Sequence, residues 1–189
     1  MKAVCVYCGS APGDSPDYAA AAVALAREIA GRGLDLIYGG AHKGLMGEIA
    51  DAALAAGGRV VGVIPQALLD REVAHENLSE LIVVSSMHER KALMAQRADA
   101  FVALPGGFGT LEELVETLTW GQLGMHEKPC ALMNVRGYYD PLLGFFDAAV
   151  QEGFLRRAHR DMLIVESEPA RLLERCTEYR APSVSKWRR

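Results

Sequence analysis

The sequence contains no apolar run approaching the roughly 20 residues that cross a membrane. Its first residues also lack the charged segment, apolar core and cleavage site of a secretory signal. We therefore expect a cytoplasmic protein with no membrane partner. Positive charge is not in excess either. The net charge of −4 and the pI near 5.7 give no overall attraction for nucleic acid, so none is expected as a partner.

Cysteine is scarce, and its four positions do not form a metal or redox site in the sequence. Cys5 and Cys8 make a C-x-x-C, but Val4, Val6 and Tyr7 place them in a strand, where residues three apart point to opposite faces. We expect buried thiols. The chain also lacks H-E-x-x-H and any close His, Cys and carboxylate spacing, so we expect no metal.

The common nucleotide-binding fingerprints are missing as well. There is no G-x-x-x-x-G-K-[ST], and the Gly107-x-Gly109 pair is followed by Glu112 where a dinucleotide motif requires glycine. A P-loop ATPase and a bound NAD are both disfavoured, and we expect no cofactor.

What is present is a regular alternation of short apolar runs and amphipathic stretches, which predicts an α/β fold. We expect one Rossmann-like, doubly wound domain over residues 1–180, with a mostly parallel sheet and helices on both faces. Residues 181–189 form a basic tail. Strands are expected at 3–8, 34–38, 59–64, 81–84, 100–104, 130–135 and 162–165, and helices at 16–31, 44–56, 86–97, 110–123, 139–151 and 169–179.

A glycine-rich turn lies between a predicted buried strand and a predicted helix. It contains Gly106, Gly107 and Gly109, followed by Thr110. The free N–H groups and the dipole of a helix N-terminus favour a phosphate, and glycines let the backbone approach it. The alternative is a turn that only allows the strand and helix to pack closely.

Glu113 stands three residues after Thr110, in a T-x-x-E pattern that can also be a helix cap. The apolar stripe of Leu111, Leu114, Val115 and Leu118 leaves Glu113 and Trp120 on the other side of the helix. An exposed tryptophan beside an acid indicates a pocket wall or a subunit contact. At a helix N-terminus Glu113 is expected to stay ionised, as a base or a stabiliser of positive charge.

Arg90 and Lys91 lie near the start of another predicted helix, where the dipole disfavours cations, so an anion is expected nearby. The alternative is a solvated cationic face shared by Arg90 and Arg97. His88 is more typical of a surface or capping residue than of a catalyst.

Two further glycine turns follow the first and second predicted strands. One contains Gly9 and Ser10, and the other contains Gly39, Gly40 and Met46. They are either simple tight turns or walls of one crevice that, in a parallel sheet, would close around a nucleotide at the same edge as Gly106–Thr110.

The motifs Met87-His88-Glu89-Arg90-Lys91 and Pro105-Gly106-Gly107-Phe108-Gly109-Thr110-Leu111-Glu112-Glu113 closely resemble those of the LONELY GUY (LOG) family, whose hallmark is P-G-G-x-G-T-x-x-E. The resemblance extends from Val4 to about Tyr179. It implies a cytokinin riboside 5′-monophosphate phosphoribohydrolase, which releases an N6-modified adenine and ribose 5-phosphate, with AMP as a further substrate of several members.

The resemblance also implies roles for particular residues. Arg90 and Glu113 match the catalytic pair, whereas Lys91, Gly106 to Thr110, Glu72 and Thr119 match substrate-binding positions. A homodimer or larger homo-oligomer is implied too. Many relatives carry an older label as lysine decarboxylases, but no lysine stands in a setting typical of pyridoxal phosphate.

The chemistry of the residues agrees with this activity. Cleavage between ribose C1′ and a base nitrogen passes through a cation-like sugar, which a carboxylate such as Glu113 would stabilise. Arg90 would either help the base leave or fix the phosphoribosyl group. The alternative function is a carrier or sensor that binds a nucleotide or cofactor without cleaving it.

Overall fold

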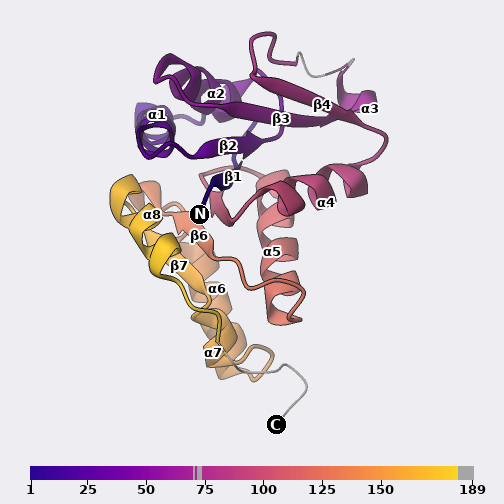
Figure 1. Cartoon of the computed structure of the whole chain (residues 1–189). Helices are drawn as coiled ribbons and strands as arrows, with labels where there is room; N and C mark the ends of the chain where they lie inside the picture. Colours follow the sequence, from indigo (N-terminus) through magenta and orange to yellow (C-terminus); the bar gives the residue numbers. More distant parts are fainter. Residues whose placement is uncertain (70, 72–73, 183–189) are drawn as a thin grey trace.

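The computed structural model describes residues 1–69, 71 and 74–182. Seven parallel strands form one sheet in the order β4-β3-β2-β1-β5-β6-β7, which confirms the predicted fold class (Figure 1). The strands are β1 Ala3–Tyr7, β2 Asp35–Tyr38, β3 Val60–Pro65, β4 Glu80–Val84, β5 Ala100–Ala103, β6 Cys130–Met133 and β7 Leu163–Glu166.

Helices cover both faces of this sheet, so it has two apolar cores. One core packs the strands against α1, α2 and α8, and the other packs them against α4, α5 and, in part, α6. The helices are α1 Pro16–Gly31, α2 Gly44–Ala55, α3 Gln66–Leu69, α4 Met87–Arg97, α5 Phe108–Gln122, α6 Asp140–Gln151, α7 Arg157–Arg160 and α8 Pro169–Glu178, with a 3-10 turn η1 at Val135–Gly137.

The four cysteines are buried and free, and Cys5 and Cys8 lie in different cores. The two thiols therefore point to opposite faces of the sheet, as the strand alternation predicts.

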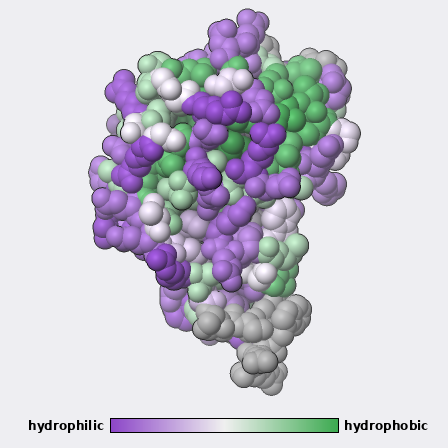
Figure 2. Space-filling view, viewed as in Figure 1, coloured by the Kyte–Doolittle hydropathy of each residue, from purple (hydrophilic) through white to green (hydrophobic). Residues whose placement is uncertain are grey.

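The edge strand β4 is less covered by helices than the other strands, and its Leu81 and Val83 side chains are exposed. Hydrophobic atoms gather in Figure 2 over the region where β4 and α3 lie in Figure 1.

Local capping explains where several helices begin. Proline stands at the start of α1, and the Ser15 side chain accepts a hydrogen bond from the backbone N–H of Asp17 at 3.3 Å. Ser86 caps α4 in the same way, through the N–H of Glu89 at 3.1 Å. Helix α5 begins at Phe108, two residues earlier than predicted.

The strand order reverses at β1, which has β2 on one side and β5 on the other. Loops after β1 and β5 therefore leave in opposite directions and open a crevice at the carboxyl edge of the sheet, where open α/β sheets bind ligands. Among the described residues, no helix is long and apolar enough to span a membrane.

Candidate active site

A cavity of about 240 Å³ lies in this crevice. Its walls come from the turn after β1, the first turn of α2, the first turn of α4 and the first two turns of α5. It is lined by Cys8, Gly9, Ser10, Met46, Met87, Arg90, Gly107, Phe108, Gly109, Thr110, Glu112 and Glu113. Segments up to about 100 residues apart in the sequence thus meet at one hollow.

The N-terminus of α5 opens into the cavity without a side-chain cap. Gly107 is its N-cap residue and has extended backbone angles, so the N–H groups of Phe108, Gly109 and Thr110 have no partner within the helix. A side chain at Gly106 would collide with that of Thr110 and come within 2.9 Å of the Gly9 nitrogen. The turn is thus built for close approach and leaves donors for an anion.

Two tyrosine hydroxyls form hydrogen bonds to the backbone of this glycine turn. The Tyr138 hydroxyl donates to the carbonyl of Gly106 at 2.7 Å, and the Tyr139 hydroxyl donates to the carbonyl of Leu104 at 2.6 Å. Tyr139 is buried. These bonds use carbonyl groups only, so the N–H groups at the start of α5 stay available.

Arg90 is buried, with 7% of its surface exposed, and is not part of a solvated cationic face. Its Nε donates to the carbonyl of Val63 at 3.1 Å, and its Nη2 donates to the carbonyl of Gly39 at 3.2 Å. A side chain at Gly39 would collide with the guanidinium and displace it from this position. Two backbone carbonyls thereby orient a buried cation on the cavity wall.

Glu113 lies across the same cavity, and its environment corrects two predictions. Thr110 is the third residue of α5 and not its N-cap, so Glu113 does not complete a capping box. Burial raises the pKa of Glu113 to about 7, opposed by the positive charge of Arg90 and supported by the negative charge of Glu112. The prediction that Glu113 stays ionised is therefore wrong, because burial favours the neutral carboxyl.

Lys91 lies beside the cavity but does not line it. Its Nζ forms ion pairs with Glu112 and, at 3.0 Å, with Glu116. Burial of the amine lowers its pKa, but these pairs outweigh that effect and raise the pKa above its ordinary value. Lys91 therefore neutralises acids at the rim of the cavity.

Not every predicted residue meets in this cavity. Gly106 lines an adjoining hollow, and Gly40 packs against Leu81 and Ile64. Thr119 lies in a separate hollow further along α5, and its hydroxyl donates to the carbonyl of Val115 at 2.7 Å. Glu72 lies outside the described residues. The predicted positions that do line the cavity are Gly9, Ser10, Met46, Arg90, Gly107, Gly109, Thr110 and Glu113.

The helical wheel of α5 is only partly right. Leu114 is buried, but Val115, expected in the core, is exposed, and Trp120 is half-buried where an exposed ring was expected. Three lining residues were missed as site residues, namely Cys8, Met87 and Glu112, and Phe108 was included only as part of the turn from Gly106 to Thr110. Met87 stands one turn before Arg90 on α4, a spacing that could have identified it.

Comparison with known proteins agrees with the motifs. A family described as "Possible lysine decarboxylase" matches residues 46–176. A cytokinin riboside 5′-monophosphate phosphoribohydrolase of Oryza sativa subsp. japonica is 52% identical over 95% of this chain and 74% of its own length. A protein of the same name from Arabidopsis thaliana is 47% identical over 95% of this chain and 84% of its own. The chain belongs to the LOG family.

Solved structures resemble this LOG-family chain in fold. The molybdenum cofactor binding protein of Rippkaea orientalis matches with a TM-score of 0.71 and 22% identity, over 94% of this chain and 97% of that one. The molybdenum cofactor carrier protein of Chlamydomonas reinhardtii matches with a TM-score of 0.70 and 20% identity, over 95% of this chain and 99% of that one. At this level of identity the likeness supports the Rossmann-like fold alone.

Proposed function

We propose that this LOG-family protein is a phosphoribohydrolase, which cleaves the N-glycosidic bond of adenosine 5′-monophosphates, including N6-substituted ones, to a free base and ribose 5-phosphate. The observation that carries the proposal is the placement of Arg90, Glu113 and the uncapped start of α5 around one cavity. The two relatives that are 52% and 47% identical to this chain are named for this activity.

The 5′-phosphate is the group that fits the start of α5. Three backbone N–H groups and the positive end of a 15-residue helix are available there. The glycines keep this surface free of side chains, since a Cβ at Gly107 or Gly109 would extend into open space. Binding the phosphate here brings the ribose toward the remainder of the cavity, where Glu113 and Arg90 lie.

Glu113 acts on the sugar. As the C1′–N bond breaks, positive charge develops on the ribose, and a carboxylate close to C1′ stabilises it. The same carboxylate orients a water, whose hydroxyl bonds to C1′ while its other proton ends on the departing base. A carboxyl with a pKa of about 7 can take and return that proton near neutral pH.

Arg90 has one of two roles. Its guanidinium is fixed by two carbonyls and by Met87, whose Sδ accepts from Nη1 at 3.8 Å, and the other N–H groups are left for the substrate. They either donate to the base as it leaves or hold the phosphoribosyl group. The two roles predict different losses: the first lowers kcat, and the second mainly raises KM.

The test is to incubate the protein with AMP and with N6-isopentenyladenosine monophosphate and to follow the free base by chromatography. We expect base and ribose 5-phosphate in equal amounts, and release reduced on the order of 100-fold or more in Glu113→Gln. Exposed Glu127 provides the matched control Glu127→Gln. Intact nucleotides after long incubation would reject hydrolysis and favour the carrier function.

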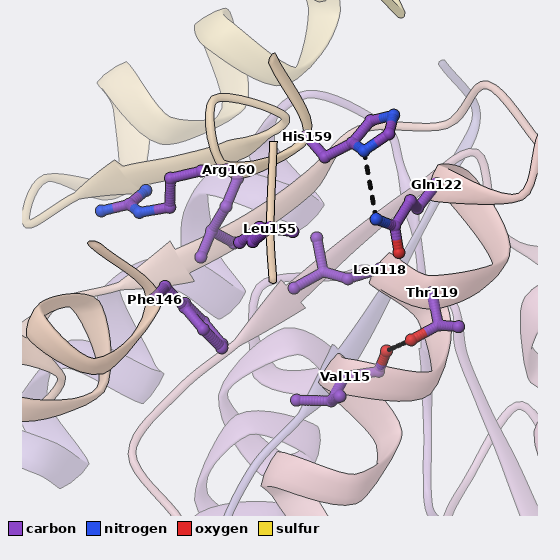
Figure 3. Close-up of a pocket in the computed structure, with 9 residues that line it drawn as sticks. Val115, Leu118, Thr119, Gln122, Phe146, Leu155, His159 and Arg160 are labelled. Carbon is purple, nitrogen blue, oxygen red and sulfur yellow. Dashed lines mark hydrogen bonds between the residues drawn. The ribbon is translucent and has the colours of Figure 1, made fainter. Parts of the chain in front are cut away.

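We also propose that the protein is a homodimer or larger homo-oligomer, formed through the side of the molecule that contains α6. This 12-residue helix has a largely apolar sequence but no buried residue, and Phe145 is 67% exposed on it. Beside it lies the hollow that contains Thr119, walled by α5, α6 and the segment around α7 (Figure 3). A second copy would cover this apolar surface.

Light scattering tests the assembly. We expect a dimer or larger species at micromolar concentration, and dissociation in Phe145→Asp, with Glu152→Lys, an exposed position just after the same helix, as the control. A monomeric parent protein would contradict this proposal.

A further inference from the structure

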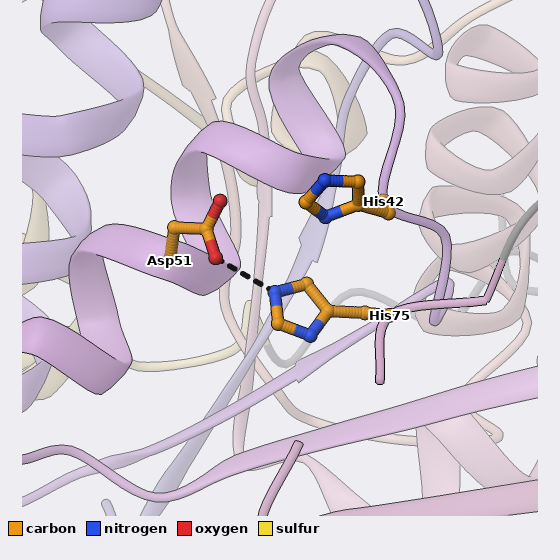
Figure 4. Close-up of side chains that lie close together, drawn as sticks. All are labelled: His42, Asp51 and His75. Atoms are coloured by element: carbon orange, nitrogen blue, oxygen red, sulfur yellow. Dashed lines mark hydrogen bonds and ion pairs between the residues drawn. The ribbon is translucent and has the colours of Figure 1, made fainter. Parts of the chain in front are cut away.

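A second cluster of ionisable side chains lies outside the cavity. His42 comes from the loop between β2 and α2, Asp51 from α2, and His75 from the segment before β4. One ligand atom from each lies within 4.8 Å of the others, and all three side chains converge on one point in Figure 4. None of them lines the cavity with Arg90 and Glu113.

The cluster is held by contacts between its two segments. The backbone N–H of His75 donates to the carbonyl of Gly40 at 3.1 Å, and Ala41 forms an antiparallel bridge with Ala74. The His75 ring is almost fully buried and lies 2.8 Å, through Nε2, from Oδ1 of Asp51. Main-chain bonds thus fix the position of the central ligand before any ion binds.

We propose that His42, Asp51 and His75 form a binding site for a divalent transition metal of the zinc type. Two imidazoles and one carboxylate are a common set of three protein ligands for zinc, whereas Mg²⁺ and Ca²⁺ prefer oxygen ligands alone. His42 and Asp51 are exposed, which leaves the remaining coordination positions to water.

Small side-chain movements complete the site. Zinc binds nitrogen and oxygen at about 2.0–2.2 Å, so its ligand atoms lie roughly 3.5 Å apart and the exposed His42 ring must turn inward. Nδ1 of His75 accepts from the N–H of Asn77 at 3.2 Å, so Nε2 carries the proton in the metal-free protein. The metal takes the place of this proton, which moves to Nδ1 so that the ring stays neutral, and the hydrogen bond from Asn77 is lost.

The proposed metal ion has a structural role and not a catalytic one. A bound ion would join the segment around His75 to α2 and to the turn after β2, and it would stabilise the folded chain. Hydrolysis at Arg90 and Glu113 does not need it, so the site can be tested independently of the proposed function.

The experiment uses full-length protein, freed of metal with EDTA and titrated with ZnCl₂ by calorimetry and with CoCl₂ by visible absorption. We expect one ion per chain, a higher melting temperature with zinc, no effect of MgCl₂, and nucleotide cleavage unchanged by EDTA. His42→Ala should lower the zinc affinity at least about tenfold. The exposed His88 of α4 gives the matched control His88→Ala, which should bind zinc like the parent.

Asp51→Asn separates ligation from folding, because the amide oxygen still accepts from His75 Nε2 while the negative ligand is lost. We expect it to fold like the parent and to bind zinc at least about tenfold more weakly. Absence of zinc binding, or equal affinity in the parent, His42→Ala and Asp51→Asn, would overturn the proposal.

Discussion

Helices α4 and α5 begin at the same edge of the sheet, and their first turns are built in opposite ways. At α4, Ser86 accepts from the N–H of Glu89, and the Glu89 carboxylate accepts from the N–H of Ser85 at 2.8 Å. At α5, Gly107 offers no side chain. One N-terminus is satisfied by the protein itself, and the other is left for a ligand.

Charged side chains from both helices then line the cavity, Arg90 from the capped helix and Glu112 and Glu113 from the open one. A capped helix start is rigid without a ligand, which suits a cation that must be oriented in advance. Under the proposed function, the open start gains its partner when the phosphate binds. The comparison teaches that the residue at the N-cap, and not only the charged residues nearby, decides whether the first N–H groups of a helix are already bonded or are free for a ligand.

The largest effect is expected from the capped helix. Arg90→Ala removes the oriented cation and should lower kcat/KM for AMP on the order of 100-fold or more. Steady-state kinetics test this, with circular dichroism to check folding and Arg90→Lys as a variant that keeps the charge. Arg97→Ala, on the same helix and in a surface ion pair with Glu80, should cleave AMP like the parent. Near-normal turnover by Arg90→Ala would remove it from the mechanism.

The next test adds a capping side chain at the start of α5. Gly107→Asp places a carboxylate at the N-cap, where its side chain has space, and should raise KM for AMP about 10–100-fold by repelling the phosphate. Gly107→Asn has the same shape and can also cap the helix but carries no charge, so it should raise KM less than Gly107→Asp does. Both variants should alter the free energy of unfolding by only a few tenths of a kcal/mol. KM values close to the parent value in both variants would place the phosphate elsewhere.

A smaller effect concerns the acid on the open helix. If the ionised form of Glu113 works, kcat/KM should fall about tenfold per pH unit below a midpoint near 7, since burial raises the pKa of Glu113 to about 7. The phosphate of AMP titrates near pH 6 and could imitate this profile. Glu112→Gln distinguishes the two, because losing its negative charge should shift only the Glu113 midpoint downward. A midpoint near 4.5 would reject the effect of burial.

The smallest effect is expected at the cap of α4. Ser86→Ala should cost about 1 kcal/mol of unfolding free energy, measured with urea, because the N–H of Glu89 loses its partner. Ser86→Thr should restore most of it. Turnover at saturating AMP should change little in either variant. A large loss of turnover with unchanged stability would mean that the cap itself belongs to the active site.

Local chemistry made much of the fold predictable. Ser15-Pro16 and Ser86 set the starts of α1 and α4, and the alternation of apolar runs gave the parallel sheet. The start of α5 was misplaced because the T-x-x-E pattern at Thr110 competes with Gly107, and only the three-dimensional turn shows which residue caps the helix.

The site was predictable as a set of residues but not in its electrostatics. Motifs indicated Arg90 and Glu113, yet the burial that raises the pKa of Glu113 depends on how α4, α5 and the turn after β1 pack together. The cluster of His42, Asp51 and His75 has no motif at all. Its members are 9 and 24 residues apart, and the bridge between Ala41 and Ala74 brings them together.

The reversal of strand order at β1 also governs how the protein is made. Strands β1 to β4 can pair as they leave the ribosome, but β1 can pair with β5 only after residues 100–103 have been synthesised, because Val4 pairs with Ala100 and Tyr7 with Ala103. Until then one side of β1 is a bare edge, open to association with other nascent chains. That late pairing also brings together the turn after β1 and the start of α5, which line the cavity together.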